Sequence, residues 1–383
     1  MSDAQLRTAC TDDDDALREL ARDAVITAGL AVWTDRRPTF RSLADRVGKR
    51  HETIVAVEQA GGGMIGSISV TLVPMSLCGT VEPVAVVGDL RVRSDWRDGM
   101  ISRQLVDAAR LLSEEWNATC GIASVFAANE RVLRMFDRLL PDTMPLGQFE
   151  VQLVLPHRAL RMPRRAHQPL AVRAARDDDV AAISELQRTH AQSHDFVHAA
   201  LADNPGWVGQ LRSAHPTSLR TLVAETTDGV LVGTLTSWDQ RHLQQHVLAK
   251  HDASTRALTW ASRVRSIAHR GVEVPHIGSS VAFRHLVFPA SIPGYGALTA
   301  LVDHELDQWR CGPTVAGMIG VPKGRAGNDI RAALRGRLHS PVRSQLVGWV
   351  NQSLPAARQR ELRATLVAAH AHDRCWPEYA VLL

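Results

Sequence analysis

The stretch Asp89-Leu-Arg-Val-Arg-Ser-Asp-Trp-Arg-Asp-Gly-Met-Ile-Ser-Arg-Gln-Leu105 joins two hydrophobic patterns of different period. Before it, the apolar run at residues 84–87 is typical of a buried strand. After the glycine, apolar residues recur with helical spacing from residue 101 to residue 112. The stretch therefore predicts a strand that leads through a short turn into a helix. The first N–H groups of such a helix have no partners, and with the helix dipole they favour a bound phosphate group.

At this turn the chain resembles a known family, the GNAT-type acyl-CoA-dependent N-acyltransferases. The family signature is a Leu-x-Val strand, an Arg or Gln a few residues later, and closely spaced small residues that open a helix holding the pyrophosphate of coenzyme A. Leu90, Val92 and Arg97 match this signature, and Leu105 falls at the expected helix position. The resemblance implies that the protein uses acetyl-CoA, or another acyl-CoA, and no metal.

The small-residue positions of the signature depart from the family pattern. Gly99 lies one residue early, and Met100 and Ser102 stand where the family has small residues. A side chain at position 100 narrows the space through which phosphates approach the backbone. Carried over residue by residue, the resemblance implies a cofactor-binding set of Leu90, Arg91, Val92, Arg97, Asp98, Gly99, Met100, Ile101, Ser102 and Asn129.

A second part of the resemblance lies downstream. Family members carry an Asn after the next strand and an aromatic residue, often Tyr, seven positions later. Asn129 matches the first position, but Phe136 stands at the second and has no hydroxyl group to protonate the departing thiolate. This loss does not prevent the reaction, because a thiol with a pKa of about 8.5 can leave as the thiolate.

Length, composition and charge limit the classes of function. The 383 residues suffice for about two domains of ordinary size, and 45% hydrophobic with 22% charged residues is typical of a soluble globular protein. The net charge of +4 comes from 44 basic and 40 acidic residues spread along the chain, so no electrostatic footprint for nucleic acid or a membrane stands out. We expect neither as a partner.

The cysteines and the N-terminal segment indicate a compartment. Five cysteines are scattered without the paired spacing of zinc or redox motifs, which favours a reducing environment. Residues 11–15 are acidic rather than basic and then apolar, and no apolar run reaches the roughly 18 residues that a membrane span requires. We therefore expect a cytoplasmic protein.

An internal repeat indicates two copies of one domain. Three segments match in the same order at nearly one offset: 6–20 with 172–186, 53–56 with 221–224, and 66–68 with 233–235. The first pair aligns without a gap, and both members read as a short strand, an acidic helix start and an amphipathic helix. Such ordered similarity is hard to obtain by chance.

The sequence therefore predicts an α/β protein of two tandem GNAT-like domains, each a mixed twisted sheet flanked by helices, followed by a C-terminal helical tail. Each copy should begin with a strand and helices, and in the first copy meandering strands should follow at residues 52–58, 64–73 and 81–93. Three prolines in a basic stretch indicate the linker. The predicted units are residues 1–158, a linker at 159–169, residues 170–350, and the tail at 351–383.

The tail is predicted to form a helix that docks on one of the two domains. Ser353 is a plausible N-cap residue, and Pro355 fits the first turn. Leu362, Leu366 and His370 follow at intervals of four residues, which places them on one face.

The second copy contains an additional segment at about residues 237–275. After Gly233 the match to the first copy resumes roughly thirty residues late, so this segment is predicted to be an insertion that acts as a lid or an interface. His242 and His246 are four residues apart and would share one face of a helix. No third ligand accompanies them at the spacing of a metal site, so we expect no metal here.

The second copy also has its own strand, turn and helix at residues 284–298. Gly294 and Gly296 leave room for phosphates, but Pro293 stands where the family has Arg or Gln. Asn328 is the candidate counterpart of Asn129. Since the first copy keeps both the Arg and the Asn, we predict that the first half holds the cofactor.

Acyl transfer to an amine needs a base that takes a proton and a donor for the thioester oxygen. Asp89, on the strand before the first turn, is aligned with His285, on the strand before the second turn, and either residue could be the catalytic base. The donor is expected to be a backbone N–H where the strand splays from its neighbour, around Arg91 or Val92.

Two classes of function follow from these features. In the first, the protein moves an acetyl or other acyl group from coenzyme A to an amine of a small molecule, with the chemistry in the first half. In the second, it is a catalytically degenerate descendant that binds acyl-CoA or a partner without turnover. Arg97 and Asn129 favour the enzyme, whereas Met100, Ser102 and Phe136 favour the binder.

Overall fold

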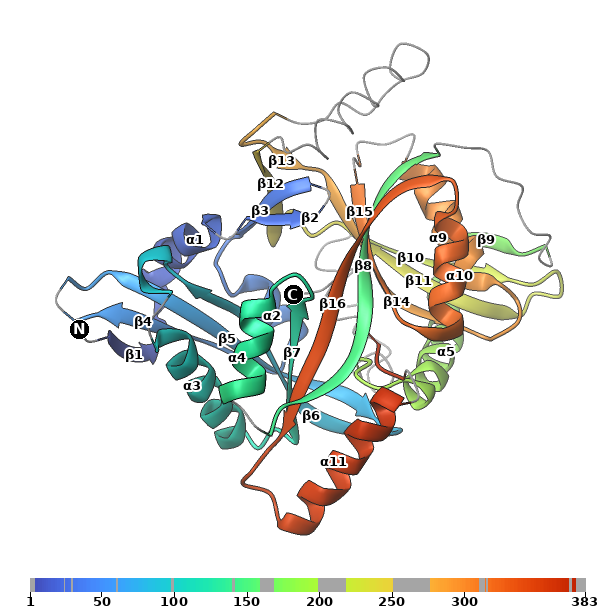
Figure 1. Cartoon of the computed structure of the whole chain (residues 1–383). Coiled ribbons are helices and arrows are strands. Elements are labelled where there is room, and N and C mark those ends of the chain that lie inside the picture. Colours follow the sequence, from blue (N-terminus) through green and yellow to red (C-terminus); the bar gives the residue numbers. More distant parts are fainter. Residues whose placement is uncertain are drawn as a thin grey trace.

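The computed structural model describes residues 4–376 apart from the gaps 24, 29, 60, 98–99, 140–141, 159–168, 199–217, 251–275, 310–313, 315 and 372–373. The described strands form a twelve-stranded sheet in the order β1-β4-β5-β6-β7-β16-β8-β15-β14-β11-β10-β9 and a four-stranded sheet in the order β13-β12-β3-β2. Helices cover the large sheet on both sides of its centre (Figure 1). The predicted α/β fold class is confirmed.

The first half of the chain supplies one side of the large sheet. Its strands are β1 (Ala4–Thr8), β2 (Ile26–Ala28), β3 (Leu30–Arg36), β4 (Arg50–Glu58), β5 (Met64–Leu77), β6 (Thr80–Val92), β7 (Cys120–Phe126) and β8 (Met144–Arg158). Its helices are α1 (Asp14–Arg22), α2 (Ser42–Val47), α3 (Ile101–Glu115) and α4 (Glu130–Leu139). The strands predicted at residues 52–58, 64–73 and 81–93 are confirmed as β4, β5 and β6, but strands β2 and β3 occupy a region where only helices were expected.

The second half supplies the other side. Its strands are β9 (Ala171–Ala174), β10 (Leu219–Glu225), β11 (Leu231–Trp238), β12 (Gln244–Lys250), β13 (Ser280–Val281), β14 (Phe283–Ser291), β15 (Ala316–Val321) and β16 (Arg337–Val350). Its helices are α5 (Val180–Ser193), α9 (Ala297–Trp309) and α10 (Gly324–Leu334), and α11 (Ala356–Ala371) follows. Most of the predicted linker lies outside the described residues.

The two halves repeat the same strand pairings. Leu6 of β1 pairs with Ala56 of β4, and Val172 of β9 pairs with Ala224 of β10 at the matching place. The acidic turns predicted after β1 and β9 are also alike, because Asp13 and Asp179 each accept a guanidinium hydrogen bond of 2.6 Å from the preceding strand. The segments matched in the sequence therefore occupy equivalent places in the fold.

The last strand of each half crosses to the other half. Strand β16 pairs with β7 of the first half, and β8 pairs with β15 of the second half, while β8 and β16 pair with each other. In Figure 1 these two long strands cross at the centre of the molecule. This exchange makes one continuous sheet, and it brings residues of β16 to the edge of the first half.

The segment predicted as an insertion joins the two halves. Strand β12 pairs with β3 of the first half, with Gln244 opposite Arg36. The predicted shared helix face of His242 and His246 is wrong, because His242 lies in a turn and His246 lies in β12. Residues 251–275 of the segment lie outside the described residues.

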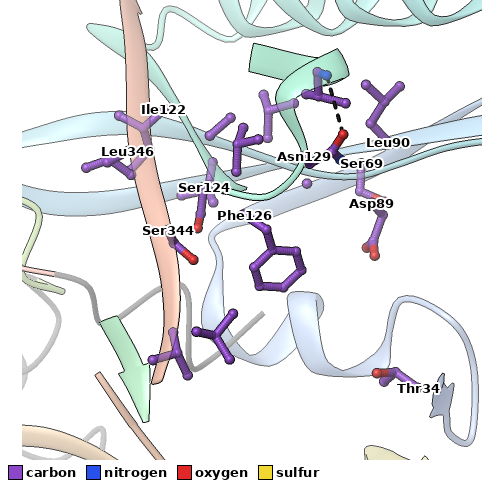
Figure 2. Close-up of a pocket in the computed structure, with 18 of the residues that line it drawn as sticks. Thr34, Ser69, Asp89, Leu90, Ile122, Ser124, Phe126, Asn129, Ser344 and Leu346 are labelled. Atoms are coloured by element: carbon purple, nitrogen blue, oxygen red, sulfur yellow. Dashed lines mark hydrogen bonds between the residues drawn. The ribbon is translucent and has the colours of Figure 1, made fainter. Parts of the chain in front are cut away.

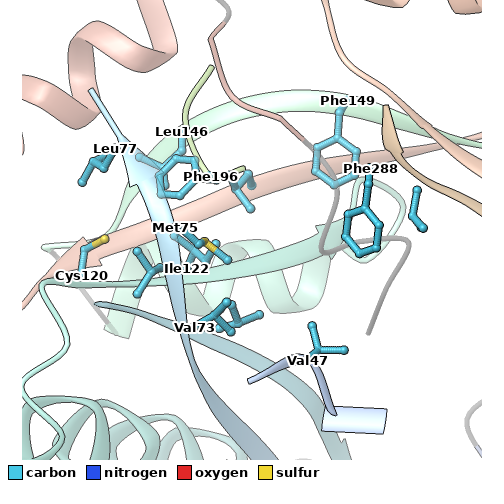
Figure 3. Packing of buried hydrophobic residues seen from close by; sticks show 14 of the residues in the cluster. Val47, Val73, Met75, Leu77, Cys120, Ile122, Leu146, Phe149, Phe196 and Phe288 are labelled. Carbon is cyan, nitrogen blue, oxygen red and sulfur yellow. The ribbon is translucent and has the colours of Figure 1, made fainter. Parts of the chain in front are cut away.

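A buried apolar cluster fills the space between the halves. It includes Met75, Ile122, Phe149, Phe196 and Phe288, which come from both sides of the sheet centre (Figure 3). Side chains of α11 complete it, so the predicted docking helix is present. No helix in the described ranges is both long and apolar enough to span a membrane.

The observed tail helix differs in detail from the prediction. It begins at Ala356 rather than just after Ser353, whose N–H binds the side chain of Asn351. Leu362 and Leu366 are buried as expected, but His370 is exposed.

Candidate active site

A cavity of about 1090 Å³ lies between the two halves of the molecule. Its walls come from β3, β5, β6 and β7 of the first half, from β12, β14 and β15 of the second half, and from β16. Asp89, Phe126 and Ser344 line it from β6, β7 and β16 respectively (Figure 2). One wall of the cavity therefore lies where β16 pairs with β7 of the first half.

Strands β6 and β7 separate at the cavity. They pair in parallel from Val84 opposite Cys120 to Val87 opposite Ala123, and no further. Residues 124–129 and 88–91 line the cavity beyond that point. The separation leaves strand edges without their usual partners, where an extended ligand can lie between two strands.

A β-bulge lies at the separation. Strand β5 pairs with β6 at Gly88 and Arg91 but skips Asp89 and Leu90. Asp89 has a φ of 53°, a left-handed conformation that is uncommon for residues other than glycine but relatively accessible to Asp. Because a bulge leaves backbone groups outside the ladder, the N–H groups of Asp89 and Leu90 are the candidates to donate hydrogen bonds to a ligand oxygen. These candidates lie one to three residues before Arg91 and Val92, around which the donor was expected.

The second half has the same bulge with different residues. Strand β14 pairs with β15 from Phe283 opposite Ala316, just as β6 pairs with β7 from Val84. Counting from these pairs, Phe288 corresponds to Asp89, and Phe288 has a φ of 54°. The predicted alignment of His285 with Asp89 is therefore wrong by three residues, because insertions in the second half hid the register from the sequence.

Two arginines surround the Asp89 carboxylate. Arg36 Nη1 donates to Oδ2 at 2.5 Å, and Arg91 Nη2 donates to Oδ1 at 3.0 Å. The side chains of Arg36, Asp89 and Arg91 are 5%, 11% and 16% exposed. Burial alone would raise the pKa of Asp89, but Arg36 and Arg91 outweigh burial and lower the pKa below its usual value. The carboxylate is therefore ionised at neutral pH and held in place by two guanidinium groups.

Three buried histidines also line the cavity. His51 Nδ1 lies 2.9 Å from Thr71 Oγ1, and burial, with a smaller contribution from Arg36, lowers the pKa of His51 to about 4. On the opposite wall, the Nε2 atoms of His246 and His285 are 3.4 Å apart. Burial lowers the pKa of His246 to about 4 and that of His285 to about 3. All three are neutral at pH 7.

Of the predicted cofactor set, Leu90, Arg91 and Asn129 line the cavity, whereas the described residues of the turn and of the helix start do not. Arg97 is exposed and its Nε donates to the carbonyl of Val92 at 3.0 Å. Met100 is 63% exposed, whereas Ile101 begins α3 and is buried. Ser102 is half-buried in the first turn of that helix. Asp98 and Gly99 lie outside the described residues.

Leu90, Val92 and Phe136 pack on the face of the sheet that carries α3. Val92 and Phe136 are buried, and Leu90 is partly buried against the same apolar cluster. Phe136 also lines the cavity, so an aromatic residue is present at the predicted place without a hydroxyl group.

Asn129 caps helix α4. Its Oδ1 accepts a hydrogen bond of 3.4 Å from the N–H of Val132, and Figure 2 shows this contact at the cavity edge. The predicted counterpart Asn328 does not hold the same place, since it lies inside α10 rather than before the helix.

Some cavity residues were not found from the sequence. Arg36 comes from a strand that was predicted as helix, and its partner Asp89 is 53 residues away. The sequence predicted a backbone N–H donor around Arg91 but no role for its guanidinium group. The one available signal for Arg36 was its position beside an apolar segment. An arginine at such a position is usually a solvated charge, so the signal did not indicate a site.

Comparison with known proteins identifies the fold. No protein-family model and no curated protein sequence matches the chain. Among solved structures, N-myristoyltransferase of Saccharomyces cerevisiae with bound myristoyl-CoA has a TM-score of 0.58 at 9% identity, over 91% of this chain and 83% of that chain. A second structure of that enzyme, with myristoyl-CoA and inhibitors, has a TM-score of 0.59 at 9% identity, over 91% and 80%.

A bacterial protein has the same arrangement. A probable N-acyltransferase from Enterococcus faecalis V583, described as a conserved protein of unknown function, has a TM-score of 0.50 at 8% identity, over 92% of this chain and 73% of that chain. At these identities the similarity concerns the fold. The chain shares its overall fold with these solved structures.

Proposed function

We propose that the protein is an acyl-CoA-dependent N-acyltransferase whose reaction takes place in the first half. The observation that carries this proposal is the bulge at Asp89 and Leu90, which faces the cavity where β6 separates from β7. The fold shared with N-acyltransferases supports it. The separated strand edges and the size of the cavity fit an extended thioester with an acyl group larger than acetyl as well as acetyl itself.

The residues of the first half would hold acyl-CoA along its length. The edges of β6 and β7 would bind the pantetheine arm, and Arg97 and the start of α3 would face the pyrophosphate. Acyl-CoA supplies a thioester whose carbonyl carbon accepts a nucleophile. The backbone N–H groups at Asp89 and Leu90 would donate to the thioester oxygen, where negative charge develops during the reaction.

The transfer forms a C–N bond and breaks the C–S bond. The amine nitrogen loses a proton, and the sulfur leaves as a thiolate because Phe136 has no proton to give. We assign the proton acceptor to Asp89, acting through water, since its carboxylate is ionised and lies at the bulge. Its low pKa makes it a weak base, so the amine's own deprotonation should contribute to the pH dependence.

A catalytically degenerate binder remains the second candidate. Phe136 favours it, and Tyr295, the tyrosine within the described residues, lies in the turn before α9 rather than near α4. The exposed Met100 at the start of α3 favours it as well.

The proposal is tested by binding and turnover measured on the same protein. Titration calorimetry with coenzyme A, acetyl-CoA and longer acyl-CoAs should detect binding, and thiol release with a panel of small amines should detect transfer. Asp89→Asn should keep acyl-CoA affinity and lower turnover by roughly 10²- to 10⁴-fold. Acyl-CoA binding without transfer to any amine would establish the binder instead.

Comparison of His285→Gln with Asp89→Asn tests which of the two residues is the base. A larger loss of turnover in His285→Gln than in Asp89→Asn would move the base to the opposite wall. Thermal melting of both variants is needed alongside, because Asp89→Asn leaves two buried guanidinium groups with less compensation.

A further inference from the structure

A polar side chain interrupts an apolar wall of the cavity. Ser344 of β16 pairs with Phe126 of β7 and with Phe149 of β8, so the three side chains lie side by side on one face of the sheet. Leu346, two residues further along β16, lies on the same face and is buried in one apolar cluster with Phe149. All four residues line the cavity, and Figure 2 shows Ser344 beside Phe126. A hydroxyl group therefore stands among apolar side chains.

This hydroxyl group has no partner in the part of the chain that the structure describes. Ser344 is 1% exposed, and its Oγ is buried without a hydrogen bond. A buried hydroxyl group without a partner is uncommon in folded proteins, and it is unfavourable because the group has lost its hydrogen bonds to water. Alanine would fit the same apolar wall without that cost. The hydroxyl group therefore fits a hydrogen-bonding partner that a ligand brings into the cavity.

Ser344 lies at the level of the bulge, across the gap between β6 and β7. Val87 and Ala123 form the last pair between those two strands. Leu90 of the bulge lies three residues beyond Val87. Phe126, the partner of Ser344, lies three residues beyond Ala123. A thioester whose oxygen is bound at the bulge thus has the hydroxyl group of Ser344 on the far side of the gap.

The two sides of the gap differ in polarity. On the β6 side stands the ionised Asp89 with its two arginine partners. This side suits the amine, whose proton the carboxylate takes up through water in the proposed reaction. On the other side is the apolar wall that contains Ser344, to which Ser124, the partner of Leu346 on β7, adds a second hydroxyl group. Since the amine occupies the β6 side, the apolar wall receives the acyl group.

We propose that the hydroxyl group of Ser344 donates a hydrogen bond to a hydroxyl or oxo substituent on the acyl chain. This inference rests on the proposed function and names the acyl class for that site: an acyl group with a polar substituent rather than an unsubstituted one. Because Ser344 lies at the level of the bulge, the substituent lies within the first few carbons of the chain. The apolar neighbours of Ser344 contact the carbon atoms.

The test compares acyl-CoA substrates that differ only in the substituent. Butyryl-CoA is compared with 2-hydroxybutyryl-CoA, 3-hydroxybutyryl-CoA and acetoacetyl-CoA, with the same amine as acceptor. At least one substituted member should exceed butyryl-CoA in kcat/KM by on the order of 10-fold, the effect expected for one hydrogen bond to a buried group. Which member is preferred identifies the position and the kind of substituent.

Variants connect the preference to Ser344. Ser344→Ala should bring the ratio of kcat/KM between the preferred substrate and butyryl-CoA close to one, whereas Ser344→Thr keeps a hydroxyl group and should retain part of the preference. Ser340→Ala is the matched control, because Ser340 lies on the same strand outside the cavity lining. Its ratio should equal that of the wild type. Melting curves confirm that the variants are folded.

The outcomes separate this inference from the proposed function. Equal kcat/KM for all four acyl-CoAs, or a preference that survives Ser344→Ala, would overturn the inference while leaving the acyltransferase intact. A preference for 2-amino-1-phenylethanol over phenethylamine that is lost in Ser344→Ala would also overturn it, because Ser344 would then belong to the acceptor site.

Calorimetric titration with the same acyl-CoAs decides if no amine is acylated. Tighter binding of a substituted acyl-CoA than of butyryl-CoA, lost in Ser344→Ala, would support the hydrogen bond. Equal binding of all four would refute it.

Discussion

The two halves of this protein share a bulge with opposite chemical properties. In the first half the bulge is formed by Asp89 and Leu90, and in the second half by Phe288 and Pro289. Leu90 has a backbone N–H, whereas Pro289 has none. Asp89 points into the cavity, while the Phe288 side chain is buried in the core between the halves, close to Phe149 in Figure 3.

This difference shows how one backbone feature can be used twice. A φ of 54° is unfavourable for a bulky residue such as Phe288, so the bulge in the second half is kept by the surrounding sheet rather than by its own residues. In that half the space at the bulge is filled by an apolar side chain that stabilises the fold. In the first half the equivalent place is polar and open to the cavity, and this favours the first half as the reactive one.

The largest expected effect comes from giving the first bulge the second half's proline. Leu90→Pro removes one backbone donor to the thioester oxygen, so turnover should fall by about 10²- to 10³-fold, as for loss of one such donor elsewhere. Steady-state assays of thiol release measure this loss of turnover. The reverse change, Pro289→Leu, should leave turnover near the wild-type rate.

Circular dichroism of Leu90→Pro must remain native-like for that comparison. A Leu90→Pro protein that is folded and fully active would show that the oxygen is not bound at this bulge. A loss of activity in folded Pro289→Leu would instead point to the second half.

A smaller effect concerns the two buried histidines on the second-half wall of the cavity. His246 and His285 have pKa values of about 4 and about 3 in the folded protein, below the value of about 6.5 expected in the unfolded chain. The unfolded chain therefore binds more protons between these values. The contribution of these histidines to the free energy of unfolding is fully present above about pH 6.5. It is lost as the pH falls toward 4, by up to about 1.4 kcal/mol per pH unit for each histidine.

Urea unfolding at pH 7.0 and pH 5.0 tests this linkage. The stability of His285→Gln should depend less on pH than that of the wild type by the contribution of one histidine. The exposed His370→Gln is the control. An unchanged pH dependence in His285→Gln would mean that this side chain is not buried as a neutral group.

The smallest effect concerns the turns that precede α3 and α9. Arg97→Ala should weaken coenzyme A binding by about 1 to 2 kcal/mol, the loss expected for one charge-assisted contact. Arg325→Ala, beside Gly294 in the second turn, should leave binding unchanged. Titration calorimetry checks both, and weaker binding only in Arg325→Ala would move the pyrophosphate site to the second half.

Local patterns in the sequence predicted much of the fold because they depend on neighbours along the chain. The strand at residues 84–87, the start of α3 and the repeated acidic turns after β1 and β9 each follow from spacing and from residue type. Strand β3 was missed although it also pairs with the preceding strand β2. Its other partner, β12, is about 200 residues away, and no local signal marks such a pair. The domain boundaries and the roles of the site residues remain predictions.

The sequence alone determined the α/β class, the two related halves and the strand–turn–helix at residues 89–105, since alternation, helical spacing and repetition are properties of the chain itself. The tertiary structure decided which strand completes each half, because β8 and β16 exchange partners through long-range pairing. It also decided the electrostatics of the site. Arg36 reaches Asp89 only after folding, and the nearby charges of Arg36 and Arg91 outweigh burial and give the carboxylate its low pKa.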